Sequence, residues 1–242
     1  MSKSAELTRK DMKEPDKFQV AAGEAASWLT GHRRTAVLTG GAVVVALLVI
    51  VTVTTYREHQ AAVAGDLLSE VYRAANGQLS PVPLPGQPGP FFADEAARQQ
   101  AVIAAAVKVL AAVPTTRAAA LASVAKGDAH LKLGELDQAA VAYQAYLSSA
   151  PKDDSFRLGA LSGLAVVEEG KGNADGALAA WTRLGVEVPA QADRADLEKA
   201  RLLAAAGKAA EAKALLAGFA EAHKGSTLVA EAQDRLARLG DR

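Results

Sequence analysis

The sequence predicts an all-α protein in which one transmembrane helix is followed by an α-solenoid of helical hairpins. Three observations predict this fold. Residues 35–56 carry no charge, and a helix of that length spans about 30 Å, the thickness of the hydrocarbon core of a bilayer. Alanine and leucine dominate the 242 residues while aromatic residues make up 5%, which favours helix over sheet. Pro114, Pro151 and Pro189 recur at intervals of 37 and 38 residues, a period typical of stacked helical hairpins.

Composition also bounds the function. The chain has 27 basic and 27 acidic residues, so it has no net charge that would attract nucleic acid. It has no cysteine, so no disulfide framework braces it and no thiol chemistry is expected. We therefore expect neither a nucleic-acid partner nor cysteine chemistry.

Residues 1–34 are predicted to form a tail that carries a short amphipathic helix over residues 15–30. This helix ends near Trp28, directly before the span, and tryptophan there suits the headgroup layer of a membrane. Two interpretations stay open. The helix either lies on the membrane and sets the depth of the anchor, or it docks onto a membrane partner.

Basic residues near the span predict its orientation. Arg33 and Arg34 adjoin its first residue, whereas the far end offers only Arg57 before Arg73. The positive-inside rule therefore places residues 1–34 in the cytoplasm and residues 57–242 outside it. A cleaved signal peptide is the alternative, because the segment 62–64 (Ala-Val-Ala) has a small-x-small form. The apolar run is too long for a signal peptide, so we favour an uncleaved anchor.

The region after the span is predicted to begin with a helix over residues 57–77, continuous with the transmembrane helix, and a second helix over 94–112. Between them lies a proline-rich insertion, residues 79–92, which we expect to be extended and solvated. A last helix over residues 226–239 is predicted to cap the stack. Its apolar stripe consists of Leu228, Val229, Ala232, Leu236 and Leu239.

The predicted hairpins share a set of packing residues when they are aligned on the prolines. A glycine inside the first helix lets a neighbouring helix approach, and a second glycine ends that helix. A small residue in the second helix then nests against the first, and a bulky ring follows one turn later. One unit has Gly127, Gly134, Ala139, Tyr143 and Pro151, and the next has Gly163, Gly170, Ala177, Trp181 and Pro189. The third unit keeps Gly207 and Ala212 but lacks the proline.

These residues resemble the tetratricopeptide repeat. The departures are Lys126 at a position that is usually leucine, and Tyr146, Leu184 and Phe219 at one that is usually alanine. The segment 170–176 also suggests an inter-helix turn two residues longer than usual. The resemblance implies a solenoid of degenerate repeats.

The whole layout is similar to the YfgM-like family of bacterial ancillary subunits of the protein-secretion translocon. The resemblance covers residues 14 to about 235, and it includes Glu24, Trp28 and Arg33 before the span. It implies a single-pass inner-membrane protein with a cytoplasmic N-terminus and a periplasmic repeat domain. It also implies a scaffold that contacts periplasmic chaperones and emerging chains near the translocon.

No constellation of residues predicts catalysis, so we expect no enzyme, cofactor, metal or small-molecule substrate. His32, His59, His130 and His223 are isolated, and no pair has the spacing of metal ligands on a helix. We expect His130 to be a packed histidine. The Gly170-Lys171-Gly172 segment lacks the lysine, the hydroxyl residue and the strand of a phosphate-binding loop.

A groove lined by the first helices is the candidate binding surface. Counting back from the turn glycines places Leu121, Val124, Asp128, Leu131 and Lys132 on it, then Arg157, Ala160, Leu164, Val167 and Glu168, then Arg194, Leu197 and Arg201. The groove is either an ordinary solvated surface or a cleft for an extended peptide or a chain's carboxylate. In the second case Arg157, Arg194 and Arg201 would capture the partner together.

Two functions follow from this layout. The first is a membrane-tethered interaction scaffold near the secretion translocon, which would need its span and tail. The second is a protein that coordinates envelope assembly or cell division, which could act with its repeat domain released.

Overall fold

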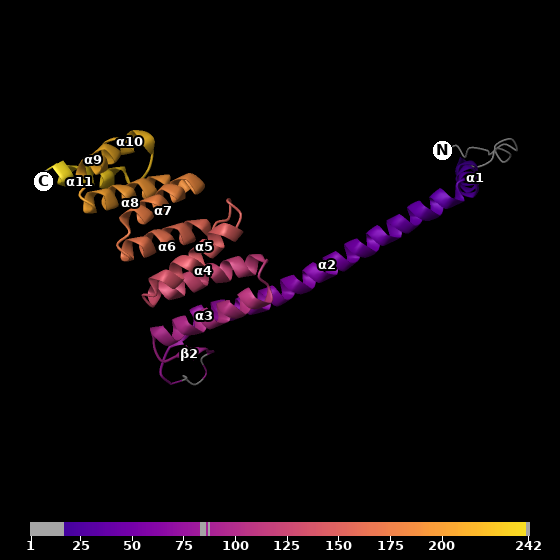
Figure 1. Ribbon diagram of the computed structural model, residues 1–242, viewed down its shortest axis with the longest axis horizontal. Coiled ribbons are helices and arrows are strands. Elements are labelled where there is room, and N and C mark those ends of the chain that lie inside the picture. The colour runs from indigo at the N-terminus through magenta and orange to yellow at the C-terminus, as the bar shows by residue number, and fades with distance from the viewer. Residues whose placement is uncertain (1–16, 83–85, 87, 241–242) are drawn as a thin grey trace, which may run out of the picture. The chain divides into compact units, whose positions relative to one another are not determined.

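The computed structural model describes residues 17–82, 86 and 88–240, and within them the protein is all-α apart from one pair of two-residue strands (Figure 1). Residues 1–59 and 60–242 form two compact units. Helix α1 (Lys17–Gly31) belongs to the first unit, and helix α2 (Arg33–Ala75) begins there and ends in the second. The amphipathic helix predicted over 15–30 thus matches α1, although residues 15 and 16 lie outside the described residues.

Helix α2 unites two elements that the sequence predicted, the span over 35–56 and the following helix over 57–77. Its 43 residues include a window with a mean hydropathy of 2.7 in which no residue is buried. Val37, Leu38 and Val45 are 66%, 73% and 60% exposed, although each is apolar. By length and composition, this helix could cross a membrane once.

The second unit is a stack of antiparallel helices in which each helix packs against its neighbours in sequence (Figure 1). The last turns of α2 pack through Ala64, Val71 and Ala74. The helices that follow are α3 (Glu95–Ala112), α4 (Arg117–Lys132), α5 (Leu136–Ser149), α6 (Arg157–Gly170), α7 (Ala174–Glu187), α8 (Ala192–Ala205), α9 (Ala209–Ala217), α10 (Phe219–Ala222) and α11 (Val229–Gly240). Asp94 caps α3 by accepting a hydrogen bond from the Ala97 N–H at 2.7 Å, as expected of a helix start at 94.

The proline-rich insertion is not helical in its described residues, as predicted, but its ends are held together. Strand β1 (Gln78–Leu79) pairs in parallel with β2 (Phe91–Phe92). The Gln78 N–H donates to the Pro90 carbonyl at 3.0 Å, and the Ser80 N–H donates to the Phe92 carbonyl at 2.8 Å. The Phe92 ring lies where a side chain on Gly77 would project. The two ends of the segment are therefore held together, and most of its described residues are exposed to solvent, as predicted.

Three inter-helix turns have the same hydrogen bonds. At Gly134 the glycine N–H donates to the carbonyl three residues back, and the next N–H donates to the carbonyl five residues back. Gly172 and Gly207 repeat both bonds, and all three glycines have φ between 74° and 76°. This is the Schellman motif, whose left-handed residue is favourably glycine. Gly134 and Gly207 therefore end their helices as predicted.

The prediction for Gly170 was wrong. Helix α6 continues through Gly170, and Gly172 takes the left-handed conformation instead. Counted from Gly172, the following small residue Ala177 comes five residues later, as Ala139 follows Gly134 and Ala212 follows Gly207. The turn is therefore not two residues longer than its counterparts. The sequence offered two glycines, and only the one that completes the backbone hydrogen bonds ends the helix.

The Tyr143 ring fills the space between neighbouring hairpins. An added Cβ would come within 2.7 Å of this ring from Gly127 in α4 and within 2.4 Å from Gly163 in α6. Tyr143 is itself fully buried, as are Ala139, Ala177 and Ala212. Trp181 is buried at the corresponding place in α7. The glycines thus make room for an aromatic ring of α5, which is shared by two hairpins.

Helix α11 closes the stack as the predicted cap does. Ala232 is buried, and Leu228, Val229, Leu236 and Leu239 pack against a cluster that includes Leu197, Leu216 and Phe219. Glu231, Asp234 and Arg238 are exposed on the other side of the helix. The third hairpin departs from the other two because Gly218 divides its second helix into α9 and α10.

We expect Gly163→Ala to lower the free energy of unfolding by about 1–3 kcal/mol, because its Cβ would overlap the buried Tyr143 ring. The matched control is Gly159→Ala in the same helix, where nothing lies within 4 Å of the added atom. Chemical denaturation of the full chain in detergent micelles measures both. Equal stability of the two variants would contradict the packing role of Gly163.

A second pair of variants tests the turn register. Gly172→Ala places a side chain on a residue with φ of 74°, so we expect a loss of about 1–2 kcal/mol. Gly170→Ala is helical and meets only the flexible end of Leu136, so a small change or a slight gain is expected. Thermal unfolding measures both variants. A larger loss of stability for Gly170→Ala than for Gly172→Ala would indicate that Gly170 ends the helix.

Candidate functional site

The turn glycines give the first helices of the three hairpins a common register, so that positions at equal distances before each glycine are equivalent. Counting back from Gly134 gives Leu121, Val124, Asp128, Leu131 and Lys132 on α4. Of these, Val124 is buried and Leu131 packs against the main core, so they do not line an open groove. The same offsets from Gly172 give Gly159, Ser162, Val166, Glu169 and Gly170 on α6, and those from Gly207 give Arg194, Leu197, Arg201, Ala204 and Ala205 on α8. We call these three sets the first-helix face.

The residues predicted on α6 are therefore wrong by two positions. Two residues correspond to about 200° around a helix, so the prediction fell on the packed side. Ala160 and Val167 are fully buried, Leu164 packs against the main core, and Arg157 is 1% exposed. The Glu168 carboxylate is 12% exposed and accepts a hydrogen bond from Asn173 Nδ2 at 2.6 Å. None of these five residues lines an open groove.

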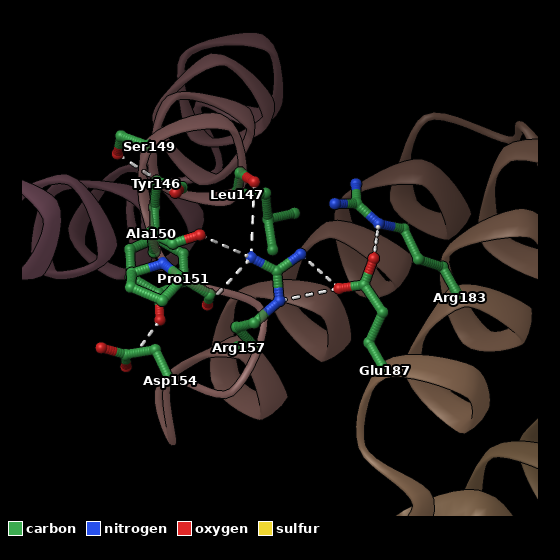
Figure 2. Close-up of polar contacts among 9 residues, drawn as sticks. All are labelled: Tyr146, Leu147, Ser149, Ala150, Pro151, Asp154, Arg157, Arg183 and Glu187. Atoms are coloured by element: carbon green, nitrogen blue, oxygen red, sulfur yellow. Dashed lines mark hydrogen bonds and ion pairs between the residues drawn. The ribbon is translucent and has the colours of Figure 1, made fainter.

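Arg157 is a buried structural residue (Figure 2). Its Nη1 donates to the carbonyls of Leu147 and Ala150 at 3.4 and 3.1 Å, and to that of Pro151 at 3.5 Å. These carbonyls lie at the C-terminal end of α5, where a helix leaves acceptors without helical partners. Arg157 stands in the first turn of α6, and its guanidinium therefore donates hydrogen bonds to the carbonyls at the end of α5 in the preceding hairpin.

The other side of the same guanidinium pairs with Glu187 at the end of α7. Arg157 Nε donates to the Glu187 carboxylate at 2.7 Å, Nη2 bonds the same oxygen, and Arg183 Nε reaches the other oxygen at 2.7 Å. Burial alone would raise the pKa of Glu187, but the hydrogen bonds from Arg183 and Arg157 hold it below its usual value. Arg157 thus joins α5, α6 and α7 and is not available to a partner.

The two remaining predicted arginines differ from each other. Arg201 donates to both oxygens of Glu169 at 2.6 and 2.7 Å, and to Glu198 at 2.7 Å. The hydrogen bond from Arg201 lowers the pKa of Glu169, which keeps that carboxylate ionised. Arg194 is exposed and has no ion-pair partner among the described residues. Because one arginine is buried and one is matched by acids, the predicted basic cluster is reduced to Arg194.

Where the sequence predicted a basic cluster, the structure has exposed apolar surface. Val166 is 47% exposed in the middle of the first-helix face, at the position that Asp128 holds one hairpin earlier. Asp128 accepts a hydrogen bond from the Tyr143 hydroxyl at 2.6 Å. The next hairpin replaces this polar pair with Val166 and Trp181, whose indole N–H is buried without a partner in the described structure. Gly159 and Gly170 flank Val166 on the same helix and carry no side chain.

A cavity of about 250 Å³ continues this face where α8 meets α9 and α11. Ala200, Ala204, Leu216 and Leu239 form its apolar lining, and Arg201, Arg235 and Arg238 line it too. Arg235 is paired with Glu231 at 2.6 Å and Arg238 with Asp234 at 2.7 Å. Sequence reasoning missed the cavity because it treated α11 only as a cap. Since each arginine already has an acid, the cavity suits an apolar side chain of a partner better than an anion.

The described residues contain no group of three histidine, aspartate or glutamate side chains that could hold a metal ion. His130 is buried in α4, and its Nδ1 lies 2.5 Å from a carboxylate oxygen of Glu135 at the turn. His223 Nε2 lies 2.9 Å from Asp196, between α10 and α8. Both histidines therefore contribute to contacts between helical segments.

We expect Arg157→Ala to destabilise the protein by about 3–5 kcal/mol, because it removes a charge partner from the largely buried Glu187 carboxylate and leaves the end of α5 uncapped. The matched control is Arg183→Ala, which removes the more exposed partner of the same carboxylate and should cost less than about 1 kcal/mol. Denaturant unfolding of both variants measures the difference. If the two variants lost the same stability, the contact among α5, α6 and α7 would not depend on Arg157.

Comparison with known proteins assigns the chain to no family. No family model matches the chain, and no curated protein matches its sequence. Whatever is concluded about function therefore depends on the apolar helix α2, on the helical repeat-like second unit, and on the first-helix face.

Proposed function

We propose that the protein is a membrane-anchored scaffold for protein–protein interaction, and that its second unit is a tetratricopeptide-like solenoid. One observation carries the proposal. Helix α2 has an apolar segment of which none is buried, and the same helix continues into residues that are buried in the repeat core, including Val71 and Ala74. A chain whose anchor and binding domain share one helix is built to present that domain at a membrane surface.

The internal equivalence of the hairpins supports the solenoid. Three Schellman turns have the same hydrogen bonds, and each is followed at the same interval by a buried alanine. In a solenoid, each unit contacts mainly its neighbours, and the first helices together form an extended binding surface. The surface here has an exposed valine, two glycines and an apolar cavity on one face, features suited to an extended polypeptide.

We further propose that residues 1–34 lie in the cytoplasm of a bacterium and that the repeat domain lies in the periplasm, close to the secretion translocon. The support is Arg33 and Arg34 at one end of the apolar segment, opposite the single Arg57 at the other. In this arrangement the first-helix face would receive emerging chains or the chaperones that collect them.

A crosslinking experiment tests the scaffold. A photoactivatable residue replaces Val166 on the first-helix face or, as a control, Val141, which is 67% exposed on α5. In native membranes we expect adducts with translocon subunits, periplasmic chaperones or secreted chains from position 166 and not from position 141. Equal labelling at both positions, or adducts only with unrelated proteins, would contradict the proposal.

The same experiment separates the scaffold from a coordinator of envelope assembly. When residues 1–56 are replaced by an unrelated anchor, a translocon subunit should lose its adducts. An envelope coordinator should keep its own adducts. Protease added to spheroplasts should digest residues 57–242, and protection of that domain would reverse the proposed orientation.

A further inference from the structure

We propose that the start of α2 is a binding site for an anionic phospholipid, with its phosphate on Arg33 and Arg34 and its upper acyl chains on Val37 and Leu38. The inference rests on the proposed membrane anchoring. It goes beyond anchoring because it assigns a particular lipid class to a particular place on the chain.

The first step is a cavity of about 420 Å³ in the first unit. The described side chains that line it are Arg33, Arg34, Val37 and Leu38. Two of them are cationic and two are apolar and largely exposed, at 66% and 73%. Such a cavity combines a charged part with an apolar part, so it fits an amphiphile better than a purely polar or purely apolar ligand.

The second step concerns charge. Among the side chains that the structure describes, which do not include that of Glu24, no carboxylate lies within ion-pair distance of Arg33 or Arg34. Most arginines of the second unit behave differently, since Arg98, Arg157, Arg201, Arg235 and Arg238 are all paired with acids. Two adjacent guanidinium groups without an acid among the described side chains favour a phosphate whose charge is not already neutralised within the same headgroup. A phosphatidylglycerol-type lipid meets this condition and phosphatidylcholine does not.

The third step is the order of the groups along the helix. Leu38 follows Arg33 by five residues, which is about 7 Å along the axis. A phospholipid presents its phosphate and then, deeper in the bilayer, the first methylenes of its acyl chains. The cavity therefore has its cationic and apolar parts in the same order as the lipid, whereas free phosphate would leave Val37 and Leu38 without a partner.

The fourth step is the local order of the junction. Trp28 stacks on His32 with ring centroids 5.0 Å apart and an angle of 19° between the planes. His32 Nδ1 and the His32 backbone N–H both contact the Trp28 carbonyl, at 3.1 and 2.9 Å. These contacts fix the passage from α1 to α2 beside the two arginines. Tryptophan at this level is typical of the membrane interface.

Native mass spectrometry of the full chain tests the proposal. The protein is released from detergent micelles that contain equimolar phosphatidylglycerol and phosphatidylcholine with identical acyl chains. We expect phosphatidylglycerol adducts to dominate and to fall about tenfold or more in the Arg33→Gln, Arg34→Gln double variant. The Arg57→Gln, Arg73→Gln double variant removes the same charge further along α2 and should keep the adducts.

Competition distinguishes the sources of phosphate. Millimolar inorganic phosphate should not displace the lipid, whereas short-chain phosphatidylglycerol should. Equal retention of the two lipids, an equal loss in both double variants, or displacement by inorganic phosphate would overturn the proposal. Circular dichroism confirms that each variant keeps its helical content.

Flotation with liposomes separates this inference from the anchoring on which it rests. If the wild-type chain floats but shows no preference for phosphatidylglycerol, only the lipid site is wrong. If the wild-type chain does not float, the membrane anchoring itself is wrong.

Discussion

Close contact between hairpins depends on one aromatic ring and the two glycines that face it. Tyr143 lies where side chains on Gly127 and Gly163 would otherwise project. Because a ring is rigid and these glycines lie in helices, the fit fixes the separation of α4, α5 and α6 together. Packing at this density leaves little room for adjustment, since interiors are packed like organic crystals.

Arg157 stabilises the same group of helices at the C-terminal end of α5, through hydrogen bonds instead of packing. The proline that ends the hairpin forces the chain out of the helix, and the carbonyls before it need donors. A single guanidinium supplies donors to that end of α5, while Glu187 on α7 balances its charge. Tyr143 therefore sets the spacing of the hairpins through volume, and Arg157 satisfies their polar ends. Neither role leaves a side chain for binding.

Much of the fold could be predicted from the sequence, because its signals are local. The uncharged run, the recurring prolines and the stripe of α11 each depend on residues within one or two helices. The error at Gly170 arose because Gly170 and Gly172 are both able to end a helix, and the choice depends on which carbonyls receive the two N–H groups of the turn. That error of two residues then turned the α6 face inward and placed Arg157 in a groove. The closure of the proline-rich loop was not predictable, because the pairing of residues 78–79 with 91–92 has no sequence signature.

The residues found on the first-helix face suit a different kind of partner from the one that the sequence predicted. A groove with three free arginines would select acidic segments and would bind less tightly as salt increases. In the structure, Arg201 on α8 and Arg235 and Arg238 on α11 are matched with acids. Val166 on α6 is exposed, and an apolar cavity opens where α8 meets α9 and α11. Recognition would then depend on burying a partner's apolar side chains, with the paired charges forming a hydrated border. Such a surface would tolerate many partner sequences, because burial of apolar side chains is not directional.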